Sequence, residues 1–244
     1  MPRIWLTDSN SNPSRTEHET LHRRETAMAG ADAPKSLEEQ VAIVGKPWDG
    51  SPYYDNAERW IHVFWDEKTV FRTLFERLDL TATLELSCGH GRHAEQIAAR
   101  TQNLTLVDIH VDNLNFCRER LRSFPSIKYV EGNGYDFSAI ESESITAIYC
   151  YDSMVHFSPD IVGSYLKDSI RILKPGGMAL LHHSNFDAPL DKHYGQNPHA
   201  RNHMTQALFR EMADAAGLAV RESVVMKWGG IEDLDCLTLL QKNT

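Results

Sequence analysis

From Asp79 onward the sequence alternates short apolar runs with segments of helical periodicity, and this alternation restricts the fold more than any other feature. The apolar runs, which predict strands, are residues 83–86, 104–108, 127–130, 145–151 and 178–183. The helical segments between them are residues 94–100, 111–123 and 161–173, the last ending at Lys174-Pro-Gly-Gly177. Strands separated by helices need crossover connections, which produce a parallel sheet with helices on both faces. The alternation therefore predicts an α/β fold.

The end of the chain predicts a change of strand direction. Residues 205–216 read as a helix closed by Gly217, and residues 219–227 and 236–241 read as two more strands. Only residues 228–235 join these two strands, and a link that short makes an antiparallel pair. We expect a Rossmann-like, seven-stranded, mostly parallel sheet with an antiparallel last strand.

The chain before Asp79 divides into two parts. Residues 1–35 are rich in Ser, Asn, Thr, Glu and Arg, which predicts a disordered tail. Residues 36–78 carry apolar stripes at helical spacing, which predict an N-terminal helical cap. Within this cap, residues 46–55 contain two prolines and a glycine and are predicted to form a loop.

The overall composition excludes several classes of partner. A formal net charge of -9 over 244 residues argues against nucleic acid and anionic membranes, which need a basic face. No apolar run approaches the roughly 20 residues that span a bilayer, and the amino-terminal residues show no apolar h-region typical of a secretory signal. The cysteines are scattered without C-x-x-C spacing, as in a reducing compartment. We expect a cytoplasmic protein of one main domain.

The strongest local motif runs from Leu84 to Ala94, where an apolar strand passes through a glycine-bearing turn into a helix. Gly89 and Gly91 let the backbone approach a ligand without a Cβ in the way, and N–H groups at the helix start can hold a carboxylate or phosphate. The same residues satisfy a loose dinucleotide fingerprint, so the turn alone does not identify the ligand.

Polar residues follow the next strands at corresponding positions. Glu85 precedes the glycine turn, Asp108 ends the second strand, and Gly132-Asn133-Gly134 follows the third. A carboxylate after the second strand can accept hydrogen bonds from ribose hydroxyls, and the third turn can offer amides to an adenine edge. Taken singly, Asp108 could be a helix cap and the third turn an ordinary turn. Together they predict one adenosine cleft.

At these residues the chain resembles the class I S-adenosylmethionine-dependent methyltransferases, from about Leu80 to Leu240. Their pattern also includes a Lys-Pro-Gly-Gly turn before strand five and a final antiparallel strand pair, both of which this sequence has. The sequence departs at Ser87, where the family usually has glycine. The resemblance implies a domain at residues 79–244 that binds S-adenosylmethionine and methylates a small-molecule acceptor.

The resemblance also implies the cofactor contacts. The amides of Ser87 to Gly91 would hold the methionine part, Asp108 the ribose, and Asn133 with Gly134 the adenine. The whole expected set is Tyr54, Glu85, Ser87, Gly89, Gly91, Asp108, Ile109, Gly132, Asn133, Gly134, Cys150 and Tyr151.

Candidates for preparing the acceptor lie after strands four and five. Asp152 and His156 are four residues apart, so His156 could take a hydroxyl proton while Asp152 orients it or holds Mg²⁺. The alternative is that His156 packs at a helix start that Asp152 caps. His182 and His183 point to opposite faces of strand five, and we favour His183 as the one that reaches the acceptor.

The remaining expectations concern the substrate and the competing functions. A polar, histidine-rich rim favours a hydroxylated metabolite such as a sugar. Loop residues His193, His199 and His203 could bind it, supply metal ligands or simply be solvated. Aromatic residues near Trp48 and Trp65 leave room for a homodimer. An NAD-dependent oxidoreductase and a non-catalytic cofactor-binding protein stay as alternatives. A nucleic-acid methyltransferase is disfavoured because no Asn/Asp-Pro-Pro-aromatic motif follows strand four.

Overall fold

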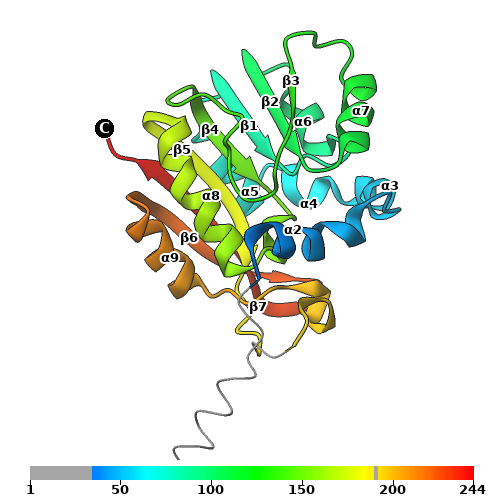
Figure 1. Ribbon diagram of the computed structural model, residues 1–244. Coiled ribbons are helices and arrows are strands. Elements are labelled where there is room, and N and C mark those ends of the chain that lie inside the picture. The colour runs from blue at the N-terminus through cyan, green and yellow to red at the C-terminus, as the bar shows by residue number, and fades with distance from the viewer. Residues whose placement is uncertain (1–34, 190–191) are drawn as a thin grey trace, which may run out of the picture. The chain divides into compact units, whose positions relative to one another are not determined.

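A seven-stranded sheet in the order β3-β2-β1-β4-β5-β7-β6 forms the centre of the fold (Figure 1). The computed structural model describes residues 35–189 and 192–244, and the unit described below is Ser36–Thr244. The predictions for residues 1–34 lie outside the described residues. The strands are β1 (Ala82–Leu86), β2 (Asn103–Asp108), β3 (Lys128–Glu131), β4 (Ile145–Cys150), β5 (Leu173–Ser184), β6 (Leu218–Trp228) and β7 (Ile231–Lys242).

The strand directions confirm the expected fold class. Strands β1 to β5 pair in parallel, whereas β7 pairs antiparallel with both β5 and β6. The two-residue link Gly229-Gly230, with both residues at positive φ, turns β6 directly into β7. This tight turn makes both strands longer than the sequence predicts.

Helices cover both faces of the sheet, and each face has its own apolar core. One core joins residues of α4 (His62–Trp65), α5 (Val70–Phe75), α6 (Arg92–Ile97) and α7 (Val111–Arg120) to the sheet. The other joins α8 (Pro159–Ile172) and α9 (Gln206–Ala215) to the opposite face. Strands buried on both sides explain the continuous apolar runs of the sequence.

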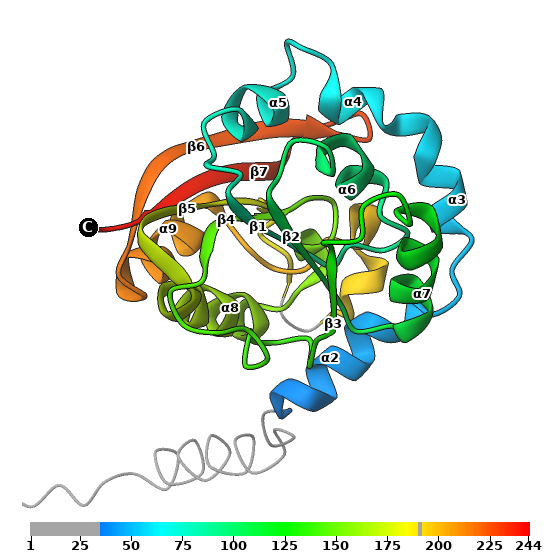
Figure 2. The ribbon, with the colours of Figure 1, turned by 90° about the horizontal axis from the view of Figure 1, so that it is seen from above.

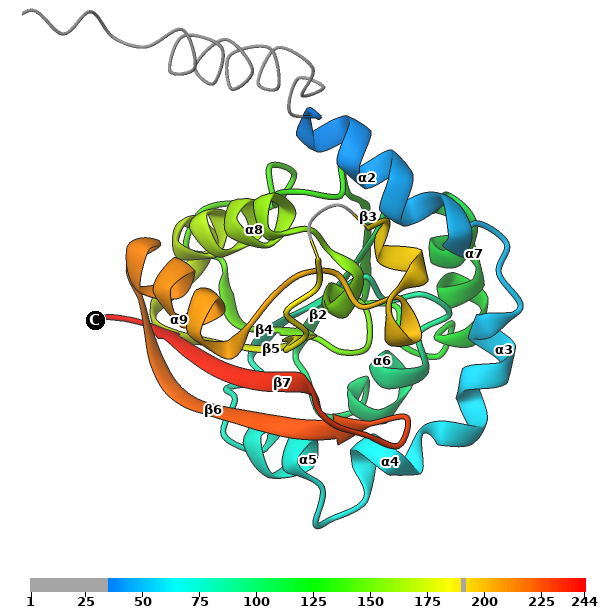
Figure 3. The ribbon, with the colours of Figure 1, turned by 90° about the horizontal axis from the view of Figure 1, so that it is seen from below.

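The segment before the sheet has more helix than its prolines suggest. It contains α2 (Leu37–Gly45) and α3 (Tyr53–Ala57), and residues 46–48 form a 3-10 turn, so the prediction of a loop over residues 46–55 is wrong at both of its ends. Pro47 and Pro52 stand at or just before the starts of these turns, where a missing N–H costs nothing. Figures 2 and 3 show the chain from α2 to α5 running around the outside of the sheet.

One boundary in the sheet also differs from expectation. The Lys174-Pro-Gly-Gly177 segment does not separate helix from strand, because β5 begins at Leu173, directly after α8. Leu173 pairs with Ile145, and the register then shifts before Met178 resumes pairing. The glycines are absorbed into an irregular strand start, with Gly176 at positive φ.

Candidate functional site

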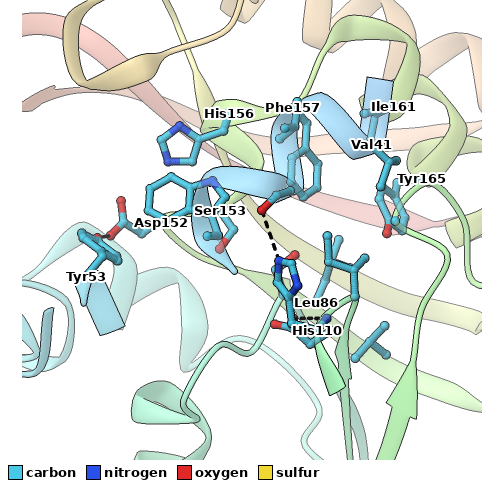
Figure 4. Close-up of a pocket in the computed structure, with 18 of the residues that line it drawn as sticks. Val41, Tyr53, Leu86, His110, Asp152, Ser153, His156, Phe157, Ile161 and Tyr165 are labelled. Atoms are coloured by element: carbon cyan, nitrogen blue, oxygen red, sulfur yellow. Dashed lines mark hydrogen bonds between the residues drawn. The ribbon is translucent and has the colours of Figure 1, made fainter. Parts of the chain in front are cut away.

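A cleft lies where β1, β2 and β4 end, and α2 forms one of its walls (Figure 4). Its volume is about 710 Å³, a value that includes space open to solvent. We call it the larger cleft, and it is lined by Val41, Val44, Gly45, Trp48, Tyr53, Tyr54, Leu86, Ser87, Val107, Asp108, Ile109, His110, Gly134, Asp152, Ser153, His156, Phe157, Ile161 and Tyr165. In Figure 4, Tyr53, Asp152 and His156 face Val41 and Tyr165 across it.

The larger cleft brings together about half of the residues expected from the sequence. These are Tyr54, Ser87, Asp108, Ile109, Gly134, Asp152 and His156. They come from the N-terminal helices and from the turns after β1, β2, β3 and β4, as expected for carboxyl ends that meet at one edge.

Asp108 is held in place as a hydrogen-bond acceptor. Its Oδ2 accepts from the Gly89 amide at 2.9 Å, and its Oδ1 accepts from the His110 amide and from Asn113 Nδ2. A carboxylate has about four acceptor positions, so capacity remains for ribose hydroxyls. The residue is oriented before any ligand binds, which reduces the entropic cost of binding.

Helix α2 packs against the end of the cleft expected to hold adenine. A Cβ on Gly134 would lie 2.5 Å from Val41 Cγ1, and a Cβ on Gly45 would lie 2.5 Å from Ile109 Cδ1. At Gly134, which also has a positive φ of 89°, this close approach favours glycine. Together with Ile161, the side chains of Val41 and Ile109 give this end apolar walls that fit a flat base.

The glycine turn has less free backbone than the sequence suggests. The amide of Cys88 donates to Val107 O, that of Gly89 to Asp108, and that of Gly91 to Cys88 O. These three amides already have acceptors within the chain. Ser87 adopts a φ of 57°, a left-handed conformation that explains why the family usually has glycine there.

Several expected cofactor residues line neither cleft. Asn133 caps its own turn, since its Oδ1 accepts from the amides of Tyr135 and Asp136. Gly91 serves packing, because a Cβ there would lie 2.9 Å from Cys117 Sγ. Glu85, Gly132 and Cys150 also line neither this cleft nor the smaller cleft described below.

Glu85 lies under the glycine turn rather than in it. It is 2% exposed, and its Oε2 accepts from Tyr149 Oη at 2.6 Å. Burial raises the pKa of this carboxyl to about 8, although the Tyr149 bond and Arg92 act in the opposite direction. Its position is that of a core group beneath the site.

This environment predicts a pH-dependent stability. The folded state raises the pKa of Glu85 above its unfolded value, so its contribution is complete at low pH and is lost as pH rises toward about 8. We expect Glu85→Gln to raise the free energy of unfolding at pH 8 by roughly 1 kcal/mol or more, with little gain at pH 5. Urea unfolding at both pH values measures this. An equal effect at both, or the same pattern in the exposed control Glu131→Gln, would contradict it.

His156 lines the larger cleft as a neutral imidazole with a defined tautomer. Its Nδ1 lies 2.8 Å from the carbonyl oxygen of Ala200, which can only accept, so Nδ1 carries the proton. Burial lowers the pKa of His156 to about 4, although the Ala200 bond raises it. The ring stacks at a tilt on Trp48, with centroids 4.8 Å apart. Nε2 therefore keeps its lone pair.

Asp152 does not orient His156. Its Oδ2 accepts from Tyr53 Oη and from Arg92 Nη2, the latter at 2.9 Å. It adopts a φ of 60°, a strained conformation for a residue other than glycine. The guanidinium beside it also disfavours Mg²⁺, and in residues 35–189 and 192–244 no three His, Cys, Asp or Glu side chains gather as a metal site would require.

A smaller cleft of about 360 Å³ continues from the larger one beside the glycine turn. The two share Tyr53, Tyr54, Ser87, Asp152 and Ser153. The other residues lining the smaller cleft are Ala57, Glu58, Cys88, Gly89, His90, Arg92, His93 and Tyr151. Tyr54 lies over the turn, because a Cβ on Gly89 would be 2.8 Å from its ring.

The structure does not support His183 as a base. Its ring is fully buried on Phe209 of α9, with centroids 3.7 Å apart, and burial lowers its pKa to about 3. The strand register turns its neighbour His182 toward the site instead. His182 Nδ1 accepts from the Asp152 amide at 3.0 Å, and its Nε2 donates to Asp235 Oδ2. His182 therefore supports the turn that carries Asp152 and lines neither cleft.

The loop histidines make local contacts rather than a common site. His193 Nδ1 accepts from the Gly195 amide, His203 Nδ1 lies 3.2 Å from Ala188 O, and His199 lies against Gly229. None of the three lines either cleft.

Sequence reasoning missed residues whose importance depends on long-range contacts. The clearest are Arg92, His93 and Phe157, all of which line a cleft. One signal was available for Arg92. A cation in the first turn of a helix is unfavourable beside the helix dipole, so its position after the glycine turn suggests another purpose.

Comparison with known proteins agrees with this geometry. Residues 83–177 match the family model described as "Methyltransferase domain". A fatty-acid O-methyltransferase of Mycolicibacterium smegmatis is 29% identical over 99 residues, which are 40% of this chain and 35% of that protein. YqeM of Bacillus subtilis, provisionally named a methyltransferase, is 24% identical over 136 residues, or 54% of this chain and 50% of that protein. The chain thus spans half or less of the length of these relatives.

A solved structure extends the likeness to the whole fold. Geranyl diphosphate C-methyltransferase from Streptomyces coelicolor A3(2) superposes with a TM-score of 0.62 over 87% of this chain and 100% of that chain. At 13% identity this likeness concerns the fold alone. No helix in the described part of the chain is long and apolar enough to cross a membrane. The family match over residues 83–177 and the strand order identify a methyltransferase domain with the class I fold, a family that uses S-adenosylmethionine as its cofactor.

Proposed function

We propose that the protein transfers a methyl group from S-adenosylmethionine to a hydroxyl oxygen of a small molecule, such as a sugar, with His156 as the base. The observation that carries the proposal is that one cleft contains both the oriented carboxylate of Asp108 and the neutral imidazole of His156. The carboxylate of Asp108 can bind the ribose hydroxyls of the cofactor, and the imidazole of His156 can take the proton of the acceptor hydroxyl.

The chemistry divides between the cofactor and the chain. S-adenosylmethionine, when bound, would supply an electrophilic methyl group on its sulfonium sulfur. Once the methyl group has been transferred, the leaving group is a neutral thioether. The chain has to orient the acceptor and remove its proton. His156 Nε2 would receive that proton, since Nδ1 already donates to Ala200 and fixes the ring.

The walls near His156 favour a small acceptor that has an apolar ring face as well as hydroxyl groups. Trp48 stands between Tyr53 and His156, with centroids 5.3 and 4.8 Å away. Aromatic faces can pack against the C–H face of a sugar, while polar groups around them bind its hydroxyls. The assignment to a hydroxyl acceptor rests on the neutral imidazole.

Cofactor binding tests the proposal directly. We expect S-adenosylhomocysteine to bind the purified protein in isothermal titration calorimetry, and Asp108→Asn to weaken it roughly 10- to 100-fold. The asparagine side chain has an NH₂ donor in place of one carboxylate oxygen. The ribose therefore loses a charge-assisted hydrogen bond, and the backbone amide of Gly89 faces an NH₂ group in place of its acceptor.

Two controls make this titration decisive. Asp112→Asn changes an exposed carboxylate in the first turn of α7 and should leave affinity within about twofold. NAD is the competing ligand. Binding of NAD in place of S-adenosylhomocysteine would replace the proposal with an oxidoreductase, and binding of neither would remove cofactor-dependent catalysis.

A further inference from the structure

The smaller cleft contains a buried ion pair beside the glycine turn. Arg92 Nη2 donates to Asp152 Oδ2 at 2.9 Å, and these side chains are 11% and 5% exposed. Both charges line the smaller cleft, which joins the larger cleft at Ser87 and Asp152. A fixed cation and a fixed anion therefore stand side by side at the end of the cofactor cleft.

Arg92 retains donors for a ligand. Its Nη1 donates to the carbonyl of Ala57 and its Nη2 to Asp152, at 2.9 Å each. A guanidinium carries five N–H groups in a rigid fork, so these two bonds leave others available. The fork matches a carboxylate geometrically and binds it with two parallel hydrogen bonds where space allows.

His93 adds a donor that lacks an acceptor. Its Nδ1 lies 3.0 Å from Trp65 Nε1, and an indole N–H can only donate, so Nδ1 must accept and Nε2 must carry the proton of the neutral ring. Within the described residues Nε2 is buried and has no hydrogen-bond partner. The side chain is 4% exposed, and an unpaired buried donor is costly. An acceptor atom of a ligand in the smaller cleft would satisfy it.

Three backbone amides of the glycine turn are already engaged. Its amides at Cys88, Gly89 and Gly91 already donate within the chain. A ligand carboxylate next to the turn therefore finds fewer backbone donors there, and Arg92 and His93 are side chains of the smaller cleft that can supply further ones.

We propose that Arg92, His93 and Asp152 bind the zwitterionic amino-acid end of S-adenosylmethionine. The guanidinium and His93 Nε2–H bind its carboxylate, and the Asp152 carboxylate binds its ammonium. This inference rests on the proposed function, because it assumes that the larger cleft holds the adenosine. It replaces the expected catalytic role of Asp152 with a role in binding.

Three ligands that share one nucleoside separate the interactions. S-adenosylhomocysteine has both charged groups, its decarboxylated amine analogue has only the ammonium, and 5′-methylthioadenosine has neither. By titration calorimetry, Arg92→Met should weaken S-adenosylhomocysteine roughly 30- to 100-fold and His93→Phe about 10-fold. Both should change the affinity for the amine analogue and for methylthioadenosine less than about threefold.

Asp152→Asn should give the complementary pattern. It should weaken both amine-bearing ligands roughly 10-fold or more and leave methylthioadenosine unchanged. Arg92→Lys keeps the charge without the fork and should recover part of the affinity for S-adenosylhomocysteine. The Arg92→Lys variant keeps the proposal testable if the His93→Phe variant does not fold.

The matched control is Arg118→Met, which removes an arginine of α7 that contacts Asn115 and Tyr129 instead of the cleft. Unchanged affinity for S-adenosylhomocysteine in Arg92→Met, or equal losses for all three ligands, would overturn the zwitterion site while leaving the proposed function intact. A wild-type protein that binds none of the three nucleosides would overturn both.

Discussion

His156→Ala is expected to lower the rate of methyl transfer to a hydroxylated acceptor roughly 100- to 10,000-fold, the usual contribution of a positioned general base. The affinity for S-adenosylhomocysteine should change less than about threefold, because Asp108 is held by other groups, namely the amides of Gly89 and His110. Release of S-adenosylhomocysteine with a panel of monosaccharides measures the rate. His156→Gln is the matched variant, since it can donate to Ala200 but cannot accept a proton.

The pH dependence of the wild type gives a second test. Burial lowers the pKa of His156 to about 4, so the neutral, active form is present above that value and is lost as pH falls through it. The rate should show no His156 inflection near pH 6.5. An inflection there that disappears in His156→Ala would contradict the buried, neutral imidazole. Undiminished activity in both variants would remove His156 as the base, and activity confined to amines or thiols would refute the hydroxyl acceptor.

Asp235→Ala is expected to lower the free energy of unfolding by about 3–5 kcal/mol, the typical cost of leaving a buried charge unpaired. Asp235 is fully buried and Arg201 is 2% exposed. Their two hydrogen bonds measure 2.8 and 2.5 Å, and His182 donates a third to the same carboxylate. Alanine would leave the guanidinium without a counter-charge. Urea unfolding at pH 7 measures the loss.

Two variants separate charge from packing in this cluster. Arg201→Met combined with Asp235→Ala removes both charges, so the pair should cost less than the sum of the single changes. Asp214→Ala in the exposed part of α9 should stay within about 0.5 kcal/mol of wild type. Strict additivity of the pair would show that the ion pair contributes nothing specific.

The same cluster predicts acid sensitivity. Burial raises the pKa of Asp235, but His182 and Arg201 outweigh it and hold the pKa at about 2. Its folded-state pKa is below the unfolded value, so its contribution is complete above about pH 4 and is lost as pH falls toward 2. Because His182 also accepts from the Asp152 amide, loss of the cluster should loosen the turn at the cofactor cleft.

The sequence was sufficient for the sheet because strand and helix periodicity are local properties. The alternation after Asp79 predicts β1 to β5, and the short final link predicts the antiparallel pair. Asp108 and Ile109 follow β2 at the edge where parallel strands end, so sequence position alone brings them to the cleft. Boundaries were less predictable, as at β5, where a glycine-rich segment is drawn into the sheet by pairing with β4.

The roles of individual side chains depended on which layers cover them. Strand alternation separates His182 from His183, but only the packing of α9 on one face shows that His183 is buried away from the site. Glu85 stands beside the glycine turn in sequence, yet Tyr149 of β4 holds it in the core.

What the sequence by itself determined is therefore the fold class, the edge of the sheet that forms the cleft and the carboxylate at the end of β2. What only the tertiary structure decided is which polar groups are free to act. The tautomer of His93 depends on Trp65 of α4, and the charge beside Asp152 depends on Arg92 of α6. Hydrogen-bond partners distant in the chain set protonation and orientation, and periodicity carries no information about such partners.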